Sequence, residues 1–165
     1  MPTRMLLLAD THLPKRAKRL PDAVLRAIDD AEVVVHAGDW VDAATLDLLE
    51  SRAREFHGVF GNNDGDELRA RLPEVARFRV EEVEVAVVHE TGPSHRREIR
   101  MDAALPGTDL LVFGHSHIPW DSVSPAGMRL LNPGSPTDRR RQPFCTMMWV
   151  GIEGTTVDAT LVPLT

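Results

Sequence analysis

The sequence predicts an α/β fold in a single domain that spans residues 1–165. Short apolar runs alternate with amphipathic segments over most of the chain, and consecutive strands with Gly- and Pro-containing turns follow them. The length of 165 residues is usual for one domain. The fractions of hydrophobic residues (42%) and charged residues (27%) are ordinary for a globular protein with a core of its own.

The alternating part of the chain predicts both strands and helices. Short apolar runs indicate buried strands at residues 5–9, 32–35, 58–60, 83–88 and 109–113. Apolar residues at helical spacing indicate helices at 22–31 and 42–56, with further helices at 64–72 and 94–104. In the segment 42–56, Leu46, Leu49 and Ala53 fall on one face, and Asp42 is placed to cap the first turn.

The last quarter of the chain predicts an antiparallel meander. Strands are expected at residues 128–131, 144–152 and 155–162. Gly151 and Gly154 are expected to mark one tight turn between the last two strands.

Charge and composition exclude several classes of protein. With 19 Lys and Arg against 25 Asp and Glu, the net charge is −6, which argues against a protein that coats polymeric nucleic acid or an anionic membrane. Cys145 is the single cysteine, so neither an intrachain disulfide nor a cysteine-based zinc site is expected. The apolar stretch near the N-terminus is too short for a signal peptide, and no membrane span is expected, so we expect a cytoplasmic protein.

Polar residues that can bind metal follow five of the predicted strands. They stand in the segments Asp10-Thr11-His12, His36-Ala37-Gly38-Asp39, Gly61-Asn62-Asn63-Asp64, His89, and Gly114-His115-Ser116-His117. Ligands of open α/β sheets collect at the carboxyl edge of the strands. Each segment alone is ordinary turn sequence, but this many His and Asp residues at successive strand ends predict a functional site.

Spacing supports the same prediction. Asp10 and His12 are two residues apart, as are His115 and His117. In extended chain, both members of such a pair face the same side.

These motifs resemble those of the calcineurin-like metallophosphoesterases, in particular the small bacterial and archaeal phosphodiesterases of the YfcE type. The family signature Asp-x-His, Gly-Asp, Gly-Asn-x-Asp/Glu, His and Gly-His-x-His occurs in that order between Asp10 and His117, and Asn132-Pro-Gly-Ser135 matches a turn common in the family. The resemblance implies a four-layer αββα sandwich of two mixed β-sheets.

The resemblance also implies two divalent metal ions. Asp10, His12 and His117 would bind the first ion. Asn62, His89 and His115 would bind the second, and Asp39 would bridge the two. Mixed imidazole, carboxylate and amide ligands suit Mn, Ni, Fe, Co or Zn better than Mg or Ca, and the family favours Mn. Two such ions can clamp phosphoryl oxygens and ionise a bridging water near neutral pH.

The expected activity is therefore hydrolysis of a small or aryl phosphodiester by attack of a metal-bridging hydroxide. Asp39 and Asn62 belong to the expected catalytic set, together with Asn63, Asp64 and His95. Active family members usually have His at the position of Asn63, where it assists the leaving group. Asn63 cannot deliver a proton, so the expected enzyme favours leaving groups that depart without protonation.

Several residues near these motifs have more than one interpretation. His36 is expected in the core or behind the ligands, His57 at the surface before a strand, and His95 either in a solvent-exposed loop or over the site. Many relatives have His-Gly-His where this chain has His89-Glu90-Thr91. The basic clusters Lys15-Arg16-Ala17-Lys18-Arg19 and Arg139-Arg140-Arg141 suit either substrate orientation or solubility.

Two alternatives to a phosphodiesterase stay open. One is a binding scaffold without strong catalysis, as in the eukaryotic retromer subunit that shares the fold of this family. The other is a phosphomonoesterase or nucleotide hydrolase. The expected partner is a small phosphorylated substrate, and a homodimer or higher homo-oligomer is compatible with the sequence.

Overall fold

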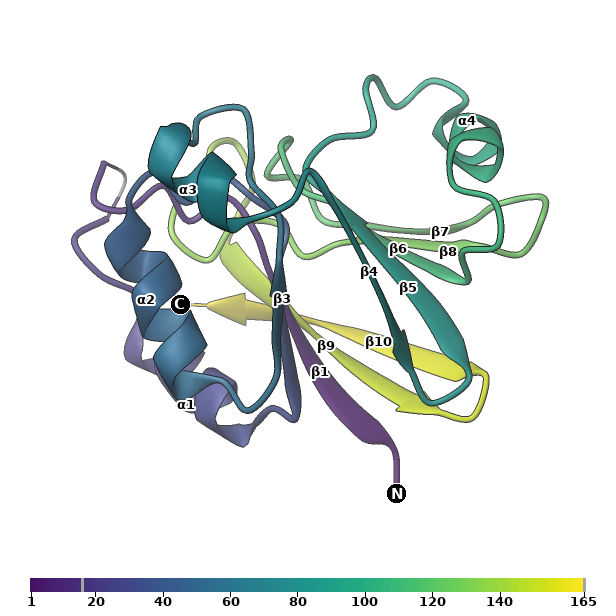
Figure 1. Cartoon of the computed structure of the whole chain (residues 1–165), viewed down its shortest axis with the longest axis horizontal. Helices are drawn as coiled ribbons and strands as arrows, with labels where there is room; N and C mark the ends of the chain where they lie inside the picture. Colours follow the sequence, from purple (N-terminus) through teal and green to yellow (C-terminus); the bar gives the residue numbers. More distant parts are fainter. Residues whose placement is uncertain (16, 165) are drawn as a thin grey trace.

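The computed structural model describes residues 1–15 and 17–164, which form two mixed five-stranded sheets packed face to face, with helices outside them (Figure 1). The first sheet has the order β10-β9-β1-β2-β3 and the second the order β4-β5-β6-β8-β7. Helices α1, α2 and α3 lie outside the first sheet and α4 lies outside the second (Figure 1). The expected αββα sandwich is confirmed.

The first sheet has a parallel centre and an antiparallel edge. Strands β1, β2 and β3 run parallel, β9 pairs antiparallel with β1, and β10 pairs antiparallel with β9. The bounds of its strands are β1 Thr3–Leu8, β2 Val33–His36, β3 Phe56–Gly58, β9 Cys145–Glu153 and β10 Thr156–Leu164.

The second sheet has the same mixed character. Strands β5, β6 and β8 run parallel, and β4 and β7 pair antiparallel with β5 and β8 at the two edges. The bounds of its strands are β4 Val75–Val80, β5 Val83–Val88, β6 Leu110–Val112, β7 Trp120–Val123 and β8 Arg129–Asn132.

Helices α1, α2 and α3 bury apolar side chains in the core outside the first sheet, whereas α4 buries Arg97 and packs the partly buried Met101 against the second. The helices are α1 Asp22–Asp30, α2 Ala43–Arg52, α3 Asp66–Arg71 and α4 Arg97–Ala104. The Asp42 carboxylate accepts a hydrogen bond from the amide of Thr45, so the expected cap of α2 is present. Among the described residues, no helix is both long enough and apolar enough to cross a membrane.

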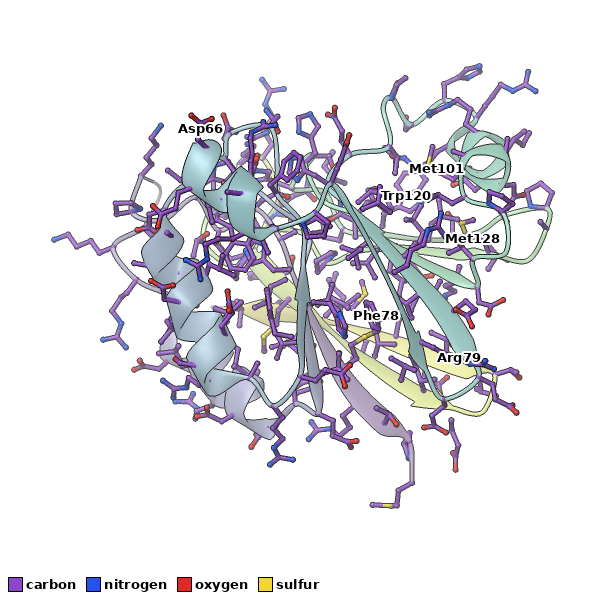
Figure 2. The ribbon with its side chains drawn as sticks, viewed as in Figure 1. Asp66, Phe78, Arg79, Met101, Trp120 and Met128 are labelled. Carbon is purple, nitrogen blue, oxygen red and sulfur yellow. The ribbon has the colours of Figure 1, made fainter. Side chains whose placement is uncertain are left out.

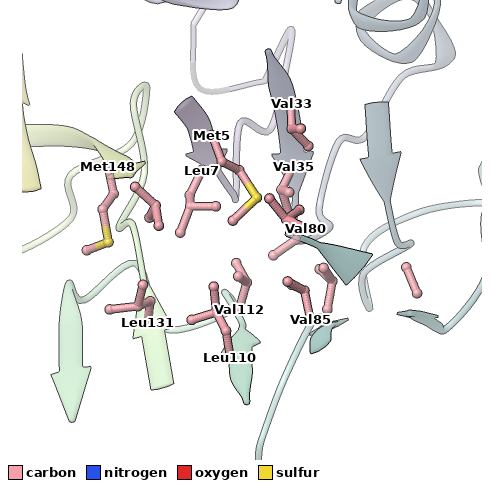
Figure 3. Close-up of a cluster of buried hydrophobic side chains, with 14 of the residues drawn as sticks. Met5, Leu7, Val33, Val35, Val80, Val85, Leu110, Val112, Leu131 and Met148 are labelled. Atoms are coloured by element: carbon pink, nitrogen blue, oxygen red, sulfur yellow. The ribbon is translucent and has the colours of Figure 1, made fainter. Parts of the chain in front are cut away.

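Strand β1 shows why its apolar run is continuous rather than alternating. Met5 and Leu7 face the second sheet across the central core (Figure 3), whereas Leu6 and Leu8 face the helices. All four side chains are fully buried. A strand covered on both faces needs apolar residues at every position, as the sequence predicted.

Four expectations about local structure were wrong. The expected antiparallel meander does not form, because β8 lies in the second sheet, parallel to β6, and only β9 and β10 form an antiparallel pair in the first sheet. The strand expected at 58–60 is β3, two residues earlier, because α2 ends at Arg52 and not at residue 56. Gly151 lies inside β9 opposite Arg4, and only Gly154, with φ +62°, is in the turn. His57 lies within β3 rather than before it, and its half-buried ring stacks on Phe78 at 3.7 Å (Figure 2 labels Phe78).

Candidate metal centre

Every residue of the expected ligand set lies in a loop just beyond the carboxyl end of a strand. Asp10 and His12 follow β1, Asp39 follows β2, and Asn62 follows β3 in the first sheet; His89 follows β5, and His115 and His117 follow β6 in the second. Loops of both sheets meet at this end, where the amide of His115 donates to Oδ1 of Asp10 at 3.2 Å. The carboxyl-edge location predicted from the sequence is therefore observed.

The backbone of these loops is unusual. Positive φ angles occur at Asp10 (56°), His12 (46°), Asp39 (62°), His115 (74°) and His117 (62°). A residue with a side chain rarely adopts this conformation, which costs of order 1–3 kcal/mol each and persists only where surrounding contacts enforce it. Strain concentrated on the candidate ligands is typical of a functional site.

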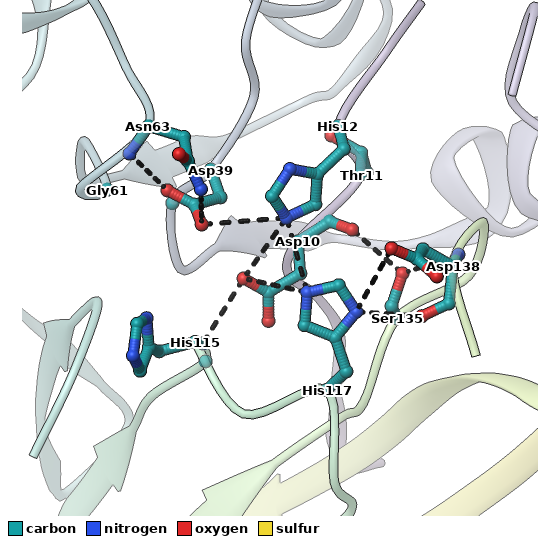
Figure 4. A network of polar contacts seen from close by, with 12 residues as sticks. Asp10, Thr11, His12, Asp39, Gly61, Asn63, His115, His117, Ser135 and Asp138 are labelled. Carbon is teal, nitrogen blue, oxygen red and sulfur yellow. Dashed lines mark hydrogen bonds and ion pairs between the residues drawn. The ribbon is translucent and has the colours of Figure 1, made fainter. Parts of the chain in front are cut away.

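The first group of donors comprises Asp10, His12 and His117, all of them buried (Figure 4). The Nε2 atoms of His12 and His117 are 3.2 Å apart. Asp10 Oδ1 lies 4.0 Å from Nε2 of His12 and 3.9 Å from Nε2 of His117. Donors that are each about 2.0–2.2 Å from one ion lie at such mutual distances.

The second group comprises Asp39, His89 and His115, and Asn62 joins it. Asn62 Oδ1 lies 2.8 Å from Nε2 of His89 and 3.1 Å from Nδ1 of His115. The two ring nitrogens are 3.3 Å apart. An amide oxygen and two imidazole nitrogens therefore point at one another across a small space.

Asp39 lies between the two groups. Its Oδ2 atom is 3.5 Å from Nε2 of His12 in the first group and 3.3 Å from Nε2 of His89 in the second. Asn63 fixes this carboxylate, because its backbone amide donates to Oδ1 at 2.9 Å and its side-chain amide donates to Oδ2 at 3.0 Å (Figure 4). One carboxylate oxygen thus contacts both groups.

The outer nitrogens of the rings are held by acceptors. Nδ1 of His117 donates to the carbonyl of Asp138 at 2.7 Å, and Nδ1 of His89 donates to the carbonyl of Ala37 at 2.8 Å. Nε2 of His115 faces the Glu90 carboxylate at 3.4 Å. A proton on the outer nitrogen leaves the inner nitrogen with a free lone pair, which is the usual arrangement of metal-binding histidines.

In the first group, a bound cation would stabilise the ionised form of a carboxylate that is otherwise buried at a cost. Burial raises the pKa of Asp10 to about 8, and charges of Asp39 and His89 act on it in opposite directions. Oδ2 of Asp10 is buried without a hydrogen-bond partner among the described residues. Burial lowers the pKa of His117 to about 4, so its ring is neutral and able to act as a ligand at pH 7.

In the second group, the pKa of the carboxyl group is lowered rather than raised. Burial opposes ionisation of Asp39, but His89 and the hydrogen bonds from Asn63 hold its pKa well below the usual value. Burial lowers the pKa of His89, and the nearby carboxylates of Asp39 and Asp10 outweigh it and raise that pKa. A cation between these donors would take the place of the proton on His89. The residues present therefore fit divalent metal.

Two glycines leave room for the ligands. A Cβ atom on Gly61 would lie 2.1 Å from Oδ1 of Asp39, and one on Gly38 would lie 2.7 Å from Nδ1 of His89. Gly38 also has φ +98°, a conformation that side chains rarely adopt. Both glycines are therefore required by the close approach of the chain to the ligands.

The remaining sequence candidates have different surroundings. Asp64 is buried below the loop, where its carboxylate accepts from the amides of Asp39, Val41 and Gly61, so it positions the loop. His95 is exposed in the loop before α4, where its carbonyl accepts a hydrogen bond from Nε of Arg100. Among the described residues, His95 is not a member of either donor group.

The other histidine and the basic clusters also have defined environments. His36 is fully buried, stacked on Trp40 and 3.1 Å from Oγ1 of Thr11, as expected for a residue behind the ligands. In the first basic cluster, Arg19 pairs with Asp22, and Arg16 lies outside the described residues. In the second cluster, Arg140 and Arg141 line a cavity together with His117.

A polar clamp that joins the two sheets was not predicted. Oγ of Ser135 donates to the carbonyl of Asp10 at 2.7 Å and accepts from the amide of Asp138 at 2.9 Å. Oγ1 of Thr137 donates to the carbonyl of Thr11 at 2.6 Å. The segment therefore holds the Asp10 loop and the acceptor for His117 together. The Asn132-Pro-Gly-Ser135 motif was its only signal in the sequence.

A family model and two relatives that resemble this chain are all described as phosphoesterases. The family model described as "Calcineurin-like phosphoesterase superfamily domain" matches residues 4–155. A "Probable metallophosphoesterase" of Methanothermobacter thermautotrophicus is 36% identical and aligns over 94% of this chain and 90% of its own length. A "Probable metallophosphoesterase" of Methanocaldococcus jannaschii is 31% identical, with 96% of this chain and 80% of the relative covered.

Two solved structures illustrate the architecture that this chain shares with known proteins. A Thermotoga maritima protein determined by solution NMR is 32% identical, with a TM-score of 0.77 and coverage of 98% of this chain and 99% of that one. Vps29 of Entamoeba histolytica in complex with zinc is 22% identical, with a TM-score of 0.76 and coverage of 97% and 98%. The second likeness concerns the fold alone.

Proposed function

The chain belongs to the calcineurin-like phosphoesterase superfamily, and we propose that it is a two-metal phosphodiesterase that hydrolyses small or aryl phosphodiesters. The observation that carries the proposal is the position of Asp39, whose Oδ2 atom contacts a histidine of each donor group. A carboxylate shared in this way is what a dinuclear centre requires. A mononuclear site would need only one of the two groups.

The donor groups define the sites for the ions. Asp10, His12 and His117 would hold the first ion, and Asn62, His89 and His115 would hold the second, with Asp39 common to both. Divalent ions bound there would neutralise the phosphoryl charge and ionise water near neutral pH. The mixed nitrogen and oxygen donors suit Mn, Ni, Fe, Co and Zn. Among these we propose Mn, because the family to which the chain belongs favours it.

The chain supports this chemistry by positioning. Asn63 holds the Asp39 carboxylate through its backbone and side-chain amides, and Asp64 holds the backbone of Asp39 from below. An amide does not titrate, so Asn63 gives no proton to a departing alkoxide. The proposed enzyme therefore prefers diesters with acidic leaving groups, such as p-nitrophenol, over alkyl diesters.

A binding scaffold is the second candidate function. Structures of Vps29 share the fold, among them a Vps29 of Chaetomium thermophilum in complex with a cyclic peptide, at 18% identity and a TM-score of 0.74. The complete donor set of the present chain favours the enzyme, because a scaffold does not need to hold strained, buried ligands in register.

Metal content and turnover test the proposal together. Protein incubated with Mn²⁺ and dialysed should hold about two ions per chain and release p-nitrophenol from bis(p-nitrophenyl) phosphate. Asp39→Asn should lose both properties. The matched change Asp66→Asn, at an exposed carboxylate of α3 (Figure 2), should keep both. A folded protein that takes up no metal, or holds two ions without any turnover, would exclude the proposed activity.

A further inference from the structure

The two histidines of the second donor group come from different strands of the second sheet. His89 follows β5 and His115 follows β6. The amide of Gly114 donates to the carbonyl of His89 at 2.8 Å, so one backbone bond joins the two loops next to the donors. Because Nε2 of His89 and Nδ1 of His115 lie 3.3 Å apart, a shift of one loop relative to the other would separate these donors.

Arg97 of α4 contacts both loops. Nε of Arg97 donates to Oγ1 of Thr91 at 2.8 Å, and Thr91 is two residues after His89. The guanidinium carbon lies 4.7 Å from the ring centroid of Phe113, which is two residues before His115. One side chain therefore joins the segment that follows His89 to the segment that precedes His115.

The Arg97 guanidinium is buried without an opposite charge. The residue is 6% exposed, and no carboxylate among the described residues forms an ion pair with it. Aromatic rings cover it instead, Phe113 and, at 4.5 Å, Trp120 (Figure 2 labels Trp120). Such burial is costly, and aromatic contacts offset only part of the cost. An apolar side chain would fill the space at less cost, so stability alone does not account for an arginine here.

A second arginine of α4 holds the same loop. The guanidinium of Arg100 donates to three carbonyls of this loop, those of Thr91 at 2.6 Å, His95 at 3.1 Å and Pro93. Thr91 is therefore bonded twice, through its hydroxyl to Arg97 and through its carbonyl to Arg100. The loop that follows β5 is thus fixed to α4, and Arg97 extends the connection to β6.

The first donor group is held by other contacts. The amide of Asp10 donates to the carbonyl of Gly38 at 2.9 Å, which joins two loops of the first sheet. Oγ of Ser135 donates to the carbonyl of Asp10. Neither bond involves α4, so loss of Arg97 should loosen the second group and spare the first.

We propose that Arg97 is a positioning residue for the second metal ion, because it holds the Thr91 and Phe113 segments where His89 and His115 meet. The inference rests on the proposed two-metal centre. Removal of a side chain that supports a metal ligand typically lowers metal affinity about 10–100-fold. Arg97 acts through the backbone segments and not on an imidazole directly, so we expect a loss of about tenfold for the second ion and none for the first.

Binding of Mn²⁺ to the metal-free protein, followed by electron paramagnetic resonance, measures this loss. Two ions that share a bridging ligand give a spin-coupled signal, whereas a single ion gives an uncoupled one. Arg97→Met should bind the first ion as the native protein does and the second about tenfold more weakly, so the uncoupled signal should persist to higher Mn²⁺ concentrations. Arg97→Lys keeps the charge but not the planar fork, and its affinity for the second ion should be intermediate.

Two further variants complete the comparison. Thr91→Val keeps the shape of the side chain but removes the Oγ1 acceptor, so it should weaken the second ion in the same way, and it replaces Arg97→Met if that variant folds poorly. Arg129→Met is the matched control. It removes a partly buried guanidinium that pairs with Asp121 at the other end of the same sheet, and it should bind both ions like the native protein.

Amide hydrogen exchange of the metal-free protein tests the contact without any ion. The Gly114 amide reports on the loops of the second group, and the Asp10 amide, which donates to Gly38, reports on the first. Arg97→Met should speed exchange about tenfold at Gly114 and leave Asp10 unchanged, whereas a general loss of stability speeds exchange at both.

The outcomes separate this inference from the function on which it rests. Selective exchange at Gly114, together with a native protein that binds fewer than two ions, would support the positioning of the two loops by Arg97 and contradict the dinuclear centre. Equal effects on Gly114 and Asp10, no effect of Arg97→Met on either amide, or equal weakening of both ions would overturn the positioning role whatever the turnover.

Discussion

Replacement of Asp64 tests whether a buried carboxylate holds the loops of the metal centre. Oδ2 accepts from the amides of Asp39 at 3.0 Å and Gly61 at 2.7 Å, and Oδ1 accepts from the amide of Val41 at 2.8 Å. The side chain is only 4% exposed, so water cannot take over these bonds without rearrangement. Asp64→Ala leaves all three amides without this acceptor, whereas Asp64→Asn keeps one oxygen, enough for the pair from Asp39 and Gly61.

The expected magnitudes follow from these bonds. An unsatisfied buried donor costs about 1–3 kcal/mol. Asp64→Asn, which loses one bond, should therefore reduce the free energy of unfolding by about 1–3 kcal/mol, and Asp64→Ala by about 3–5 kcal/mol after some relaxation. For a chain of this length, each kcal/mol corresponds to about 2–4 °C in Tm.

Denaturant unfolding followed by circular dichroism, in EDTA and in Mn²⁺, measures these differences. Asp66→Asn is the matched control, because Asp66 is exposed at the start of α3 and its change should cost at most about 1 kcal/mol. In Mn²⁺ the Ala variant should lose additional stability relative to the native protein, because Asp39 is displaced. An Ala variant within about 1 kcal/mol of the native protein, or no more affected than the Asn variant, would show that the reasoning is wrong.

Three further changes have distinct expected outcomes. Asp39→Ala should reduce the metal content from about two ions per chain to less than one, whereas His117→Ala should leave about one, as elemental analysis after dialysis can check. Native protein should show a steep dependence of diester hydrolysis on leaving-group pKa, and Asn63→His should flatten it; a shallow dependence in the native protein would mean that another group supplies the proton. Trp40→Phe, which removes the 2.9 Å bond from the indole to the Val59 carbonyl, should lower the free energy of unfolding by about 1–3 kcal/mol, measured by denaturant unfolding.

The sequence predicted the inner strands of the second sheet better than its edge strands. Strands covered on both faces, such as β1 and β6, contain continuous apolar runs. Strands β4 and β7 were not predicted, because an edge strand needs few apolar residues. In β4 the exposed arginines alternate with apolar residues, and β7 is half polar. Pairing with β5 and β8, rather than local pattern, makes these segments strands.

The chemistry of the site was present in the sequence as residue types at strand ends. Spacing predicted Asp10 beside His12 on the assumption of extended chain. Both residues instead have positive φ angles, so the fold of the loop places them in one donor group. Spacing does not reveal that Asp64 binds three backbone amides, nor that His95 lies exposed in the loop before α4. Both depend on how loops from different strands fold over one another.

The amino-acid sequence by itself determined the αββα fold, the family, and the donors available for metal. Only the tertiary structure decided which donors meet: His12 and His117 are 105 residues apart in the chain, and their ring nitrogens are 3.2 Å apart. Likewise, only the tertiary structure brings His12 and His89 to one oxygen of Asp39. Local spacing fixes the direction of neighbouring side chains, whereas contacts between the two sheets depend on strand order and on the packing of the core between them.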